Sequence, residues 1–124
     1  MRLLLDTQIM LWWLLDEPRL KPDTRQLIRG NSCLVSVASI WEVAIKHRLG
    51  KLPVAPASFR EHCLMTGATL LPVLDSHTIE TSALPRIHDD PFDRLLIAQA
   101  RLEGLMAVSA NRHWPSYDVS PQPA

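Results

Sequence analysis

Short runs of consecutive apolar residues, separated by helix-like segments, are the feature that most constrains the fold of this chain. Unbroken apolar runs of this length are typical of parallel strands that are covered on both faces. The predicted strands are residues 2–5, 33–37, 69–73 and 106–109, with a fifth candidate at 117–120. The predicted helices are residues 7–15, 22–30, a helix from Ser36 or Ser39 to 49, 58–66, 75–84 and 91–104. This alternation predicts an α/β fold with a mainly parallel central sheet of four to five strands and helices on both faces.

Length and charge limit what the chain can be. Its 124 residues are enough for one domain with a real core, expected over residues 1–120, with a frayed tail at 121–124. The formal net charge is zero, so no long-range field attracts nucleic acid. A nucleic-acid ligand would therefore have to be held by local basic groups or by metal ions.

Cysteine usage and the N-terminal residues point to the cytoplasm. Cys33 and Cys63 lie in apolar contexts without CxxC spacing, as free buried thiols do. Asp6 interrupts the first apolar run too early for a signal peptide. The apolar residues 9–15 are far fewer than the roughly 20 that a membrane span needs, so no membrane association is expected.

An acidic stretch opens the last predicted long helix. Pro91 suits the first helical position, and Asp89 or Asp90 suits the N-cap, where a carboxylate accepts a backbone N–H. Asp93 lies in the first turn, where the helix dipole favours negative charge. Taken alone, the stretch is fully explained as a helix start without any chemistry.

Other polar side chains are predicted to reach the same edge of the sheet. Ligands of open parallel sheets bind outside the carboxyl ends of the strands. Four chain segments deliver side-chain oxygens to that edge, through Asp6, Glu42, the pair Asp90 and Asp93, and Asn111.

Each of these residues also has a purely structural interpretation. Asp6 could cap the first helix, and Asn111 could be a turn residue. Glu42 could close a capping box with Ser39, although its helical neighbour Ile45 places it on an apolar face.

Several carboxylates at one buried edge would repel one another unless a cation offset their charge. Hard oxygen ligands without supporting cysteines suit Mg²⁺ or Mn²⁺ rather than Zn²⁺. Such a site activates water and stabilises charge on a phosphate. The residues alone therefore predict a metal-assisted phosphoester hydrolase and do not name its substrate.

Three stretches carry a resemblance to a known family. They are residues 4–8 (LLDTQ) with 11–14 (LWWL), residues 39–46 (SIWEVAIK) and residues 90–100 (DPFDRLLIAQA). Together and in this order they resemble the three motifs of PIN-domain proteins of the VapC type, across essentially the whole chain.

The resemblance implies a three-layer α/β/α sandwich and a Mg²⁺-dependent endoribonuclease, with Mn²⁺ able to substitute. It further implies the toxin of a type II toxin–antitoxin pair, with tRNA or rRNA as substrate, a small VapB-type antitoxin as partner, and a homodimer. By type and place, Asp6, Glu42 and Asp93 match the family's metal-binding acids. Asp90 matches a recurrent acid of the third motif, and Thr7 matches a hydroxyl that contacts water or phosphate.

The chain departs from the family pattern at two positions. Asn111 stands where an acid is common, so the resemblance implies a weaker second metal and a water or phosphate contact at Asn111. Gln8 stands where histidine is common.

Basic and histidine side chains receive weaker assignments. Arg94 could pair with an acid or touch RNA. Candidates for phosphate contacts by position alone are Lys46, Arg48, Arg86 and Arg112. Histidines without motif context, expected at the surface, are His62, His77 and His113.

Three functions compete at this stage. The leading hypothesis is a metal-dependent ribonuclease toxin that leaves 5′-phosphate and 3′-hydroxyl ends. The second is a catalytically weak PIN-like protein that binds RNA or a partner, motivated by Asn111. The third, a small-molecule phosphatase, ranks last because Gln8 stands where the haloacid-dehalogenase pattern has its second aspartate.

Overall fold

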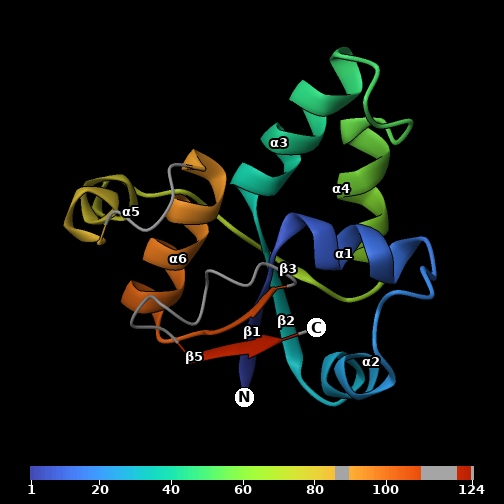
Figure 1. The fold of residues 1–124 in the computed structure, drawn as a ribbon, viewed down its shortest axis with the longest axis horizontal. Coiled ribbons are helices and arrows are strands. Elements are labelled where there is room, and N and C mark those ends of the chain that lie inside the picture. The colour runs from blue at the N-terminus through green and yellow to red at the C-terminus, as the bar shows by residue number, and fades with distance from the viewer. Residues whose placement is uncertain (86–89, 110–119, 124) are drawn as a thin grey trace.

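The computed structural model describes residues 1–85, 90–109 and 120–123. In the described part, a central sheet separates two layers of helices (Figure 1). The strands are β1 Arg2–Leu5, β2 Ser32–Ser36, β3 Thr69–Leu71, β4 Met106–Ser109 and β5 Ser120–Pro123. Their order is β3-β2-β1-β4-β5 and every pairing is parallel, which confirms the predicted sheet.

The helices fall on two sides of this sheet. Helices α5 and α6 lie on one side, and α1, α2, α3 and α4 lie on the other (Figure 1). Their bounds are α1 Thr7–Leu14, α2 Pro22–Arg29, α3 Val37–Arg48, α4 Pro56–Met65, α5 Asp75–Glu80 and α6 Pro91–Glu103. A 3₁₀ turn at Thr81–Ala83 follows α5, so the helix predicted to reach residue 84 is shorter than expected. The three-layer α/β/α arrangement is confirmed.

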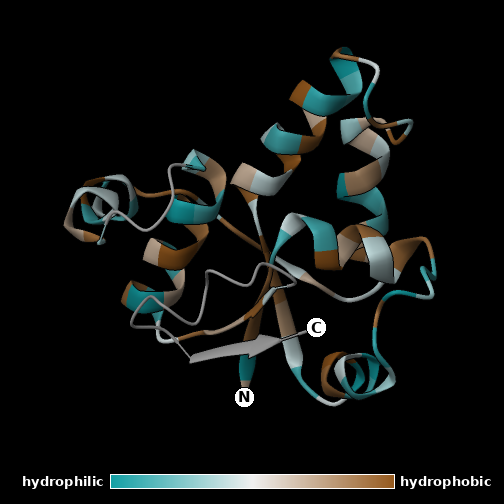
Figure 2. Ribbon diagram, viewed as in Figure 1, coloured by the Kyte–Doolittle hydropathy of each residue, from teal (hydrophilic) through white to brown (hydrophobic). Residues whose placement is uncertain are grey.

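Alternate side chains of β1 serve two cores, because successive strand residues point to opposite faces. Leu3 and Leu5 are buried in a cluster with Phe59 and other residues of α1 to α4. Leu4 is buried on the other face with Leu96 and other residues of α6. In Figure 2 apolar, brown colour accordingly runs through the strands at the centre of the molecule.

The last strand extends beyond its predicted end at residue 120, and residues 117–119 of the predicted strand lie outside the described residues. Ser120–Pro123 pairs with β4, so residues 121–123, expected as a frayed tail, belong to the sheet. Two prolines are tolerated because β5 is an edge strand, where only alternate N–H groups face the neighbouring strand.

His77 is buried, which corrects its predicted surface position. Its Nδ1 accepts a hydrogen bond from the Leu74 N–H, and its Nε2 lies 2.9 Å from Glu103 Oε2. Gln99 Nε2 lies 3.3 Å from the same Nδ1. Glu103 and Gln99 come from α6, 26 and 22 residues away, and no local pattern reveals them.

Helix length bears on membrane association. The longest helix in the described ranges, α6, has 13 residues. Within those ranges no helix is both long and apolar enough to span a bilayer.

Candidate active site

A cleft of about 340 Å³ opens where β1 ends and where α1, α3 and α6 meet. Its lining combines four carboxylates with one ammonium group. The lining residues are Asp6, Thr7, Gln8, Leu11, Glu42, Lys46, Asp90 and Asp93. The structure thus brings together the acids that the sequence placed at one edge of the sheet.

Asp6 is fixed at the junction of β1 and α1. Its Oδ1 accepts the Ile9 N–H at 2.7 Å, so Asp6 caps α1 as its structural interpretation predicted. Its Oδ2 accepts the Ser109 hydroxyl at 2.6 Å, and its own N–H donates to the Val108 carbonyl at 3.0 Å. The carboxylate is only 5% exposed, so it is both buried and held at both oxygens.

Burial raises the pKa of Asp6 from 3.8 to about 7. The hydrogen bonds from Ser109 and Ile9 oppose this rise, whereas the negative charges of Asp93 and Glu42 add to it. Asp93 and Glu42 therefore lie close enough to Asp6 to influence its ionisation.

Glu42 projects from α3 toward Asp6's neighbour, Thr7. The N-cap of α3 is Ser36, whose Oγ accepts the Ala38 N–H, so Glu42 does not form a capping box with Ser39. Its Oε1 accepts the Thr7 hydroxyl at 2.6 Å. Its Oε2 lies 2.9 Å from Lys46 Nζ.

The hydroxyls of Thr7 and Ser39 form a short hydrogen-bonded chain that ends at the Glu42 carboxylate. Thr7 Oγ1 lies 2.9 Å from Ser39 Oγ, and both residues are buried. A hydroxyl has one proton, so Thr7 donates to the carboxylate while Ser39 donates to Thr7. Thr7, expected as a water or phosphate contact, thus holds Glu42 in the described arrangement.

Asp90 and Asp93 enter the cleft from the first turn of α6. Asp90 is the N-cap, and its Oδ1 accepts the N–H groups of Phe92 and Asp93 at 2.9 and 3.1 Å. The predicted cap at this helix is therefore Asp90, while Asp89 lies outside the described residues. Asp90 is exposed and Asp93 is half-buried.

The other predicted contacts have different positions. The Arg94 guanidinium donates to the carbonyls of Thr81, Leu84 and Pro85, and Arg94 does not line the cleft. Asn111 lies outside the described residues, as do Arg86 and Arg112.

The sequence did not reveal the role of Ser109. Leu5 pairs with Val108 in the sheet, so the residues that follow them, Asp6 and Ser109, end adjacent strands. A predicted register between β1 and β4 would have shown this contact.

The lining fits a divalent cation by its chemistry. Carboxylate oxygens are the ligands that Mg²⁺ and Mn²⁺ prefer, and the negative charge around Asp6 is what such an ion offsets. In the described ranges, however, no three His, Cys, Asp or Glu side chains are already arranged around a point that could hold an ion. Glu42 Oε2, in particular, faces Lys46.

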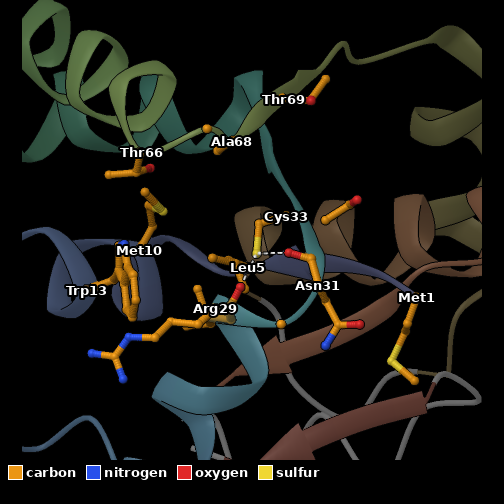
Figure 3. Close-up of a pocket in the computed structure, with 14 residues that line it drawn as sticks. Met1, Leu5, Met10, Trp13, Arg29, Asn31, Cys33, Thr66, Ala68 and Thr69 are labelled. Atoms are coloured by element: carbon orange, nitrogen blue, oxygen red, sulfur yellow. Dashed lines mark hydrogen bonds between the residues drawn. The ribbon is translucent and has the colours of Figure 1, made fainter.

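A larger cavity of about 720 Å³ lies near the amino ends of β1 and β2 (Figure 3). Among the described residues its lining contains no carboxylate or histidine, and the Arg29 guanidinium lies over the Trp13 ring at 5.6 Å. Burial raises the pKa of the Cys33 thiol, which suppresses its reactivity. The described lining therefore offers no carboxylate ligand for a divalent cation.

Comparison with solved structures shows the fold. The chain is similar to VapBC2 from Rickettsia felis bound to a promoter DNA fragment, with a TM-score of 0.72 and 14% identity over 99% of this chain and 98% of that one. It is also similar to DNA-bound VapBC from Salmonella typhimurium, with a TM-score of 0.70 and 16% identity over 99% and 98% of the two chains.

Sequence comparison supplies the family. Ribonuclease VapC16 of Mycobacterium tuberculosis is 52% identical over 42 residues, which cover 29% of this chain and 30% of that relative. The model of the PIN domain matches residues 3–119. The chain therefore belongs to the PIN-domain family.

Proposed function

We propose that this protein is a metal-dependent endoribonuclease that hydrolyses RNA phosphodiesters. The observation that carries the proposal is the buried Asp6 carboxylate, whose pKa is raised further by Asp93 and Glu42 across one open cleft. Asp6, Glu42 and Asp93 would hold Mg²⁺ or Mn²⁺, with Asp90 as a secondary acid. The bound ion supplies activation of water and stabilisation of charge on the phosphate, leaving 5′-phosphate and 3′-hydroxyl ends.

The chain's own residues position this chemistry. Ser109 and the Ile9 N–H fix the two oxygens of Asp6, and Thr7 fixes one oxygen of Glu42. Asp90 fixes the start of α6 and thereby the position of Asp93. Preorganised ligands reduce the reorganisation that accompanies ion binding.

We infer the biological role from the relatives. Similar solved structures include two VapBC complexes and a toxin–antitoxin complex from Klebsiella pneumoniae, and the partial relative is a ribonuclease. The proposed role is therefore that of the toxin of a type II pair in the cytoplasm, acting on tRNA or rRNA and neutralised by a VapB-type antitoxin.

An exposed apolar surface supports a protein partner. Trp41 is 63% exposed and packs edge-to-face on Phe92, with ring centroids 5.3 Å apart. Together with Ile45 and Leu95 they line a groove of about 300 Å³. By contrast Ile9 and the next two residues of α1 are buried, so much of the apolar first helix serves the core.

The test is cleavage of a structured RNA pool by the purified protein with Mg²⁺, with Mn²⁺ and with EDTA. We expect cleavage only with a divalent ion, loss of activity in Asp6→Asn, and 5′-phosphate ends. Cleavage in EDTA, or full activity in Asp6→Asn, would contradict the proposal. Turnover of an aryl phosphate ester with none of RNA would instead indicate a phosphatase.

A second candidate is a PIN-like protein that binds RNA or a partner and cleaves weakly. The pairing of Glu42 with Lys46 favours it, because that pairing leaves no ready-made ligand set among the described residues. It predicts RNA retention without turnover at saturating Mn²⁺.

A further inference from the structure

Lys46 lies in the acidic cleft in an arrangement that stability alone does not explain. It follows Glu42 by one helical turn on α3, and its ammonium contacts Glu42 Oε2 at 2.9 Å. The Lys46 side chain is 47% exposed, and pairs this exposed contribute little to folding. It is, however, the basic side chain among the described residues that line the cleft.

The contact occupies an oxygen that a cation would need. Glu42 Oε1 accepts the Thr7 hydroxyl, and the other oxygen, Oε2, is in contact with the Lys46 ammonium. A divalent ion bound to Oε2 would lie close to that ammonium and would be repelled by it. The Glu42 side chain is only 13% exposed, which leaves it little room to present another face. Lys46 and a divalent ion therefore compete for the same atom.

Charge favours an exchange of the two cations. Among the described residues that line the cleft, Lys46 supplies the ammonium group and four residues supply carboxylates, namely Asp6, Glu42, Asp90 and Asp93. A divalent ion bound among them repels that ammonium, and the flexible four-carbon stem of lysine lets it move toward the cleft mouth. There it meets the phosphates of an entering RNA strand, for which an ammonium is a suitable contact.

We propose that Lys46 is an exchangeable counter-ion: it neutralises Glu42 in the metal-free protein and transfers to an RNA phosphate when the metal binds. This inference rests on the proposed function, since it requires a metal at the acids and RNA in the cleft. Lys46 thus has two proposed roles: it contacts the RNA substrate, and it weakens metal binding in the absence of RNA.

The test measures Mn²⁺ binding by calorimetry on the full chain without RNA. Lys46→Met removes the ammonium beside Glu42, so we expect Mn²⁺ to bind about two- to fivefold more tightly. This range is the energy of an exposed ion pair converted into a ratio of affinities. Lys46→Arg should bind Mn²⁺ like the wild type. Lys51→Met, which removes an equal charge at an exposed residue outside the cleft lining, should also match the wild type.

A second measurement uses a fluorescein-labelled random 15-nucleotide RNA. Each lysine variant is combined with Asp93→Asn to prevent cleavage, and Mn²⁺ is added at a concentration that saturates the Asp93→Asn protein. Lys46→Met should weaken RNA binding and reduce its salt dependence by about one ion, whereas Lys46→Arg should restore both. Unchanged or weaker Mn²⁺ binding in Lys46→Met would overturn the inference while leaving the proposed nuclease intact. Absence of Mn²⁺ binding in the wild type would overturn both.

Discussion

At the scale of single residues, the cleft depends on how Asp6 is buried. The carboxylate is removed from water, and the two hydrogen bonds it accepts do not fully compensate that loss, so its pKa reaches about 7. A group in this condition binds a proton or a cation readily near neutral pH. The same buried carboxylate therefore lowers the stability of the metal-free protein and favours the binding of a metal ion.

Asp6→Asn should stabilise the metal-free protein in a pH-dependent way. Because the folded-state pKa of about 7 lies above the ordinary 3.8, the stability contributed by Asp6 is fully present below pH 4 and is lost as the pH rises to 7. The difference in free energy of unfolding between Asp6→Asn and wild type should therefore grow over this range, by up to about 4 kcal/mol, and level off above it.

Urea unfolding in EDTA at pH 5, 6, 7 and 8 measures this difference. Asp23→Asn, which replaces an exposed carboxylate on α2, is the matched control and should show no such growth. A stability difference for Asp6→Asn that is the same at all four pH values would contradict the account.

Ser109→Ala should weaken metal binding without changing the fold. The variant removes a hydrogen bond that lowers the pKa of Asp6, so the pKa rises and a proton competes better with the metal. Because the lost hydrogen bond is made to a charged group, we expect the Mn²⁺ affinity at pH 7 to fall about tenfold. The loss should be smaller at pH 8.5, and Ser32→Ala on β2 should show none.

At the scale of elements, the first turn of α6 has two tasks. Asp90 ends the preceding segment and caps the helix, while Asp93, one turn later, faces the cleft. The sequence predicted the cap from Pro91 and its neighbouring acids. It did not reveal that Arg94 ties this turn to the carbonyls of Thr81 and Leu84.

The two tasks can be separated by substitution at Asp90. Asp90→Ala should cost about 1 kcal/mol of stability, and Asp90→Asn should restore it, because asparagine caps nearly as well. Asp90→Asn should also retain more RNA cleavage than Asp93→Asn. Equal loss of cleavage in the two asparagine variants would show that Asp90 is a primary ligand.

The buried His77 forms a polar link between α5 and α6. His77→Leu removes the partner of the Leu74 N–H and of Glu103, so the free energy of unfolding should fall by roughly 2–4 kcal/mol. Mn²⁺ affinity should stay unchanged, since the network lies outside the cleft lining. The exposed His62 provides the control, and His62→Leu should leave stability within about 0.5 kcal/mol.

At the scale of the whole molecule, the parallel sheet collects distant residues at one edge. Three acids of the cleft come from the starts or early turns of three helices, and the parallel strands bring those turns together. The sequence predicted this meeting of Asp6, Glu42 and Asp93. What did not follow were contacts set by side-chain packing across long separations. Ser109 reaches Asp6 across 103 positions, and no local periodicity encodes such a pair.

The same reasoning explains the errors at the edges of the fold. His77 was expected at the surface because its partners on α6 are remote in sequence. Residues 121–124 were predicted as a frayed tail, yet Ser120–Pro123 pairs with β4 at the edge of the sheet, where prolines are tolerated. Sequence patterns therefore determined the layers and the acidic edge, whereas tertiary packing determined which side chains are held and how.

Mn²⁺ binding to the wild type and to three single variants tests the central claim most directly, namely that these acids form one cation site. The variants are Asp6→Asn, Glu42→Gln and Asp93→Asn, measured by calorimetry at pH 7.5 alongside the exposed control Asp23→Asn. We expect one tight site in the wild type and the control, weakened at least about tenfold in each of the three variants. Binding in Glu42→Gln and Asp93→Asn that equals the wild type would contradict a shared cation site.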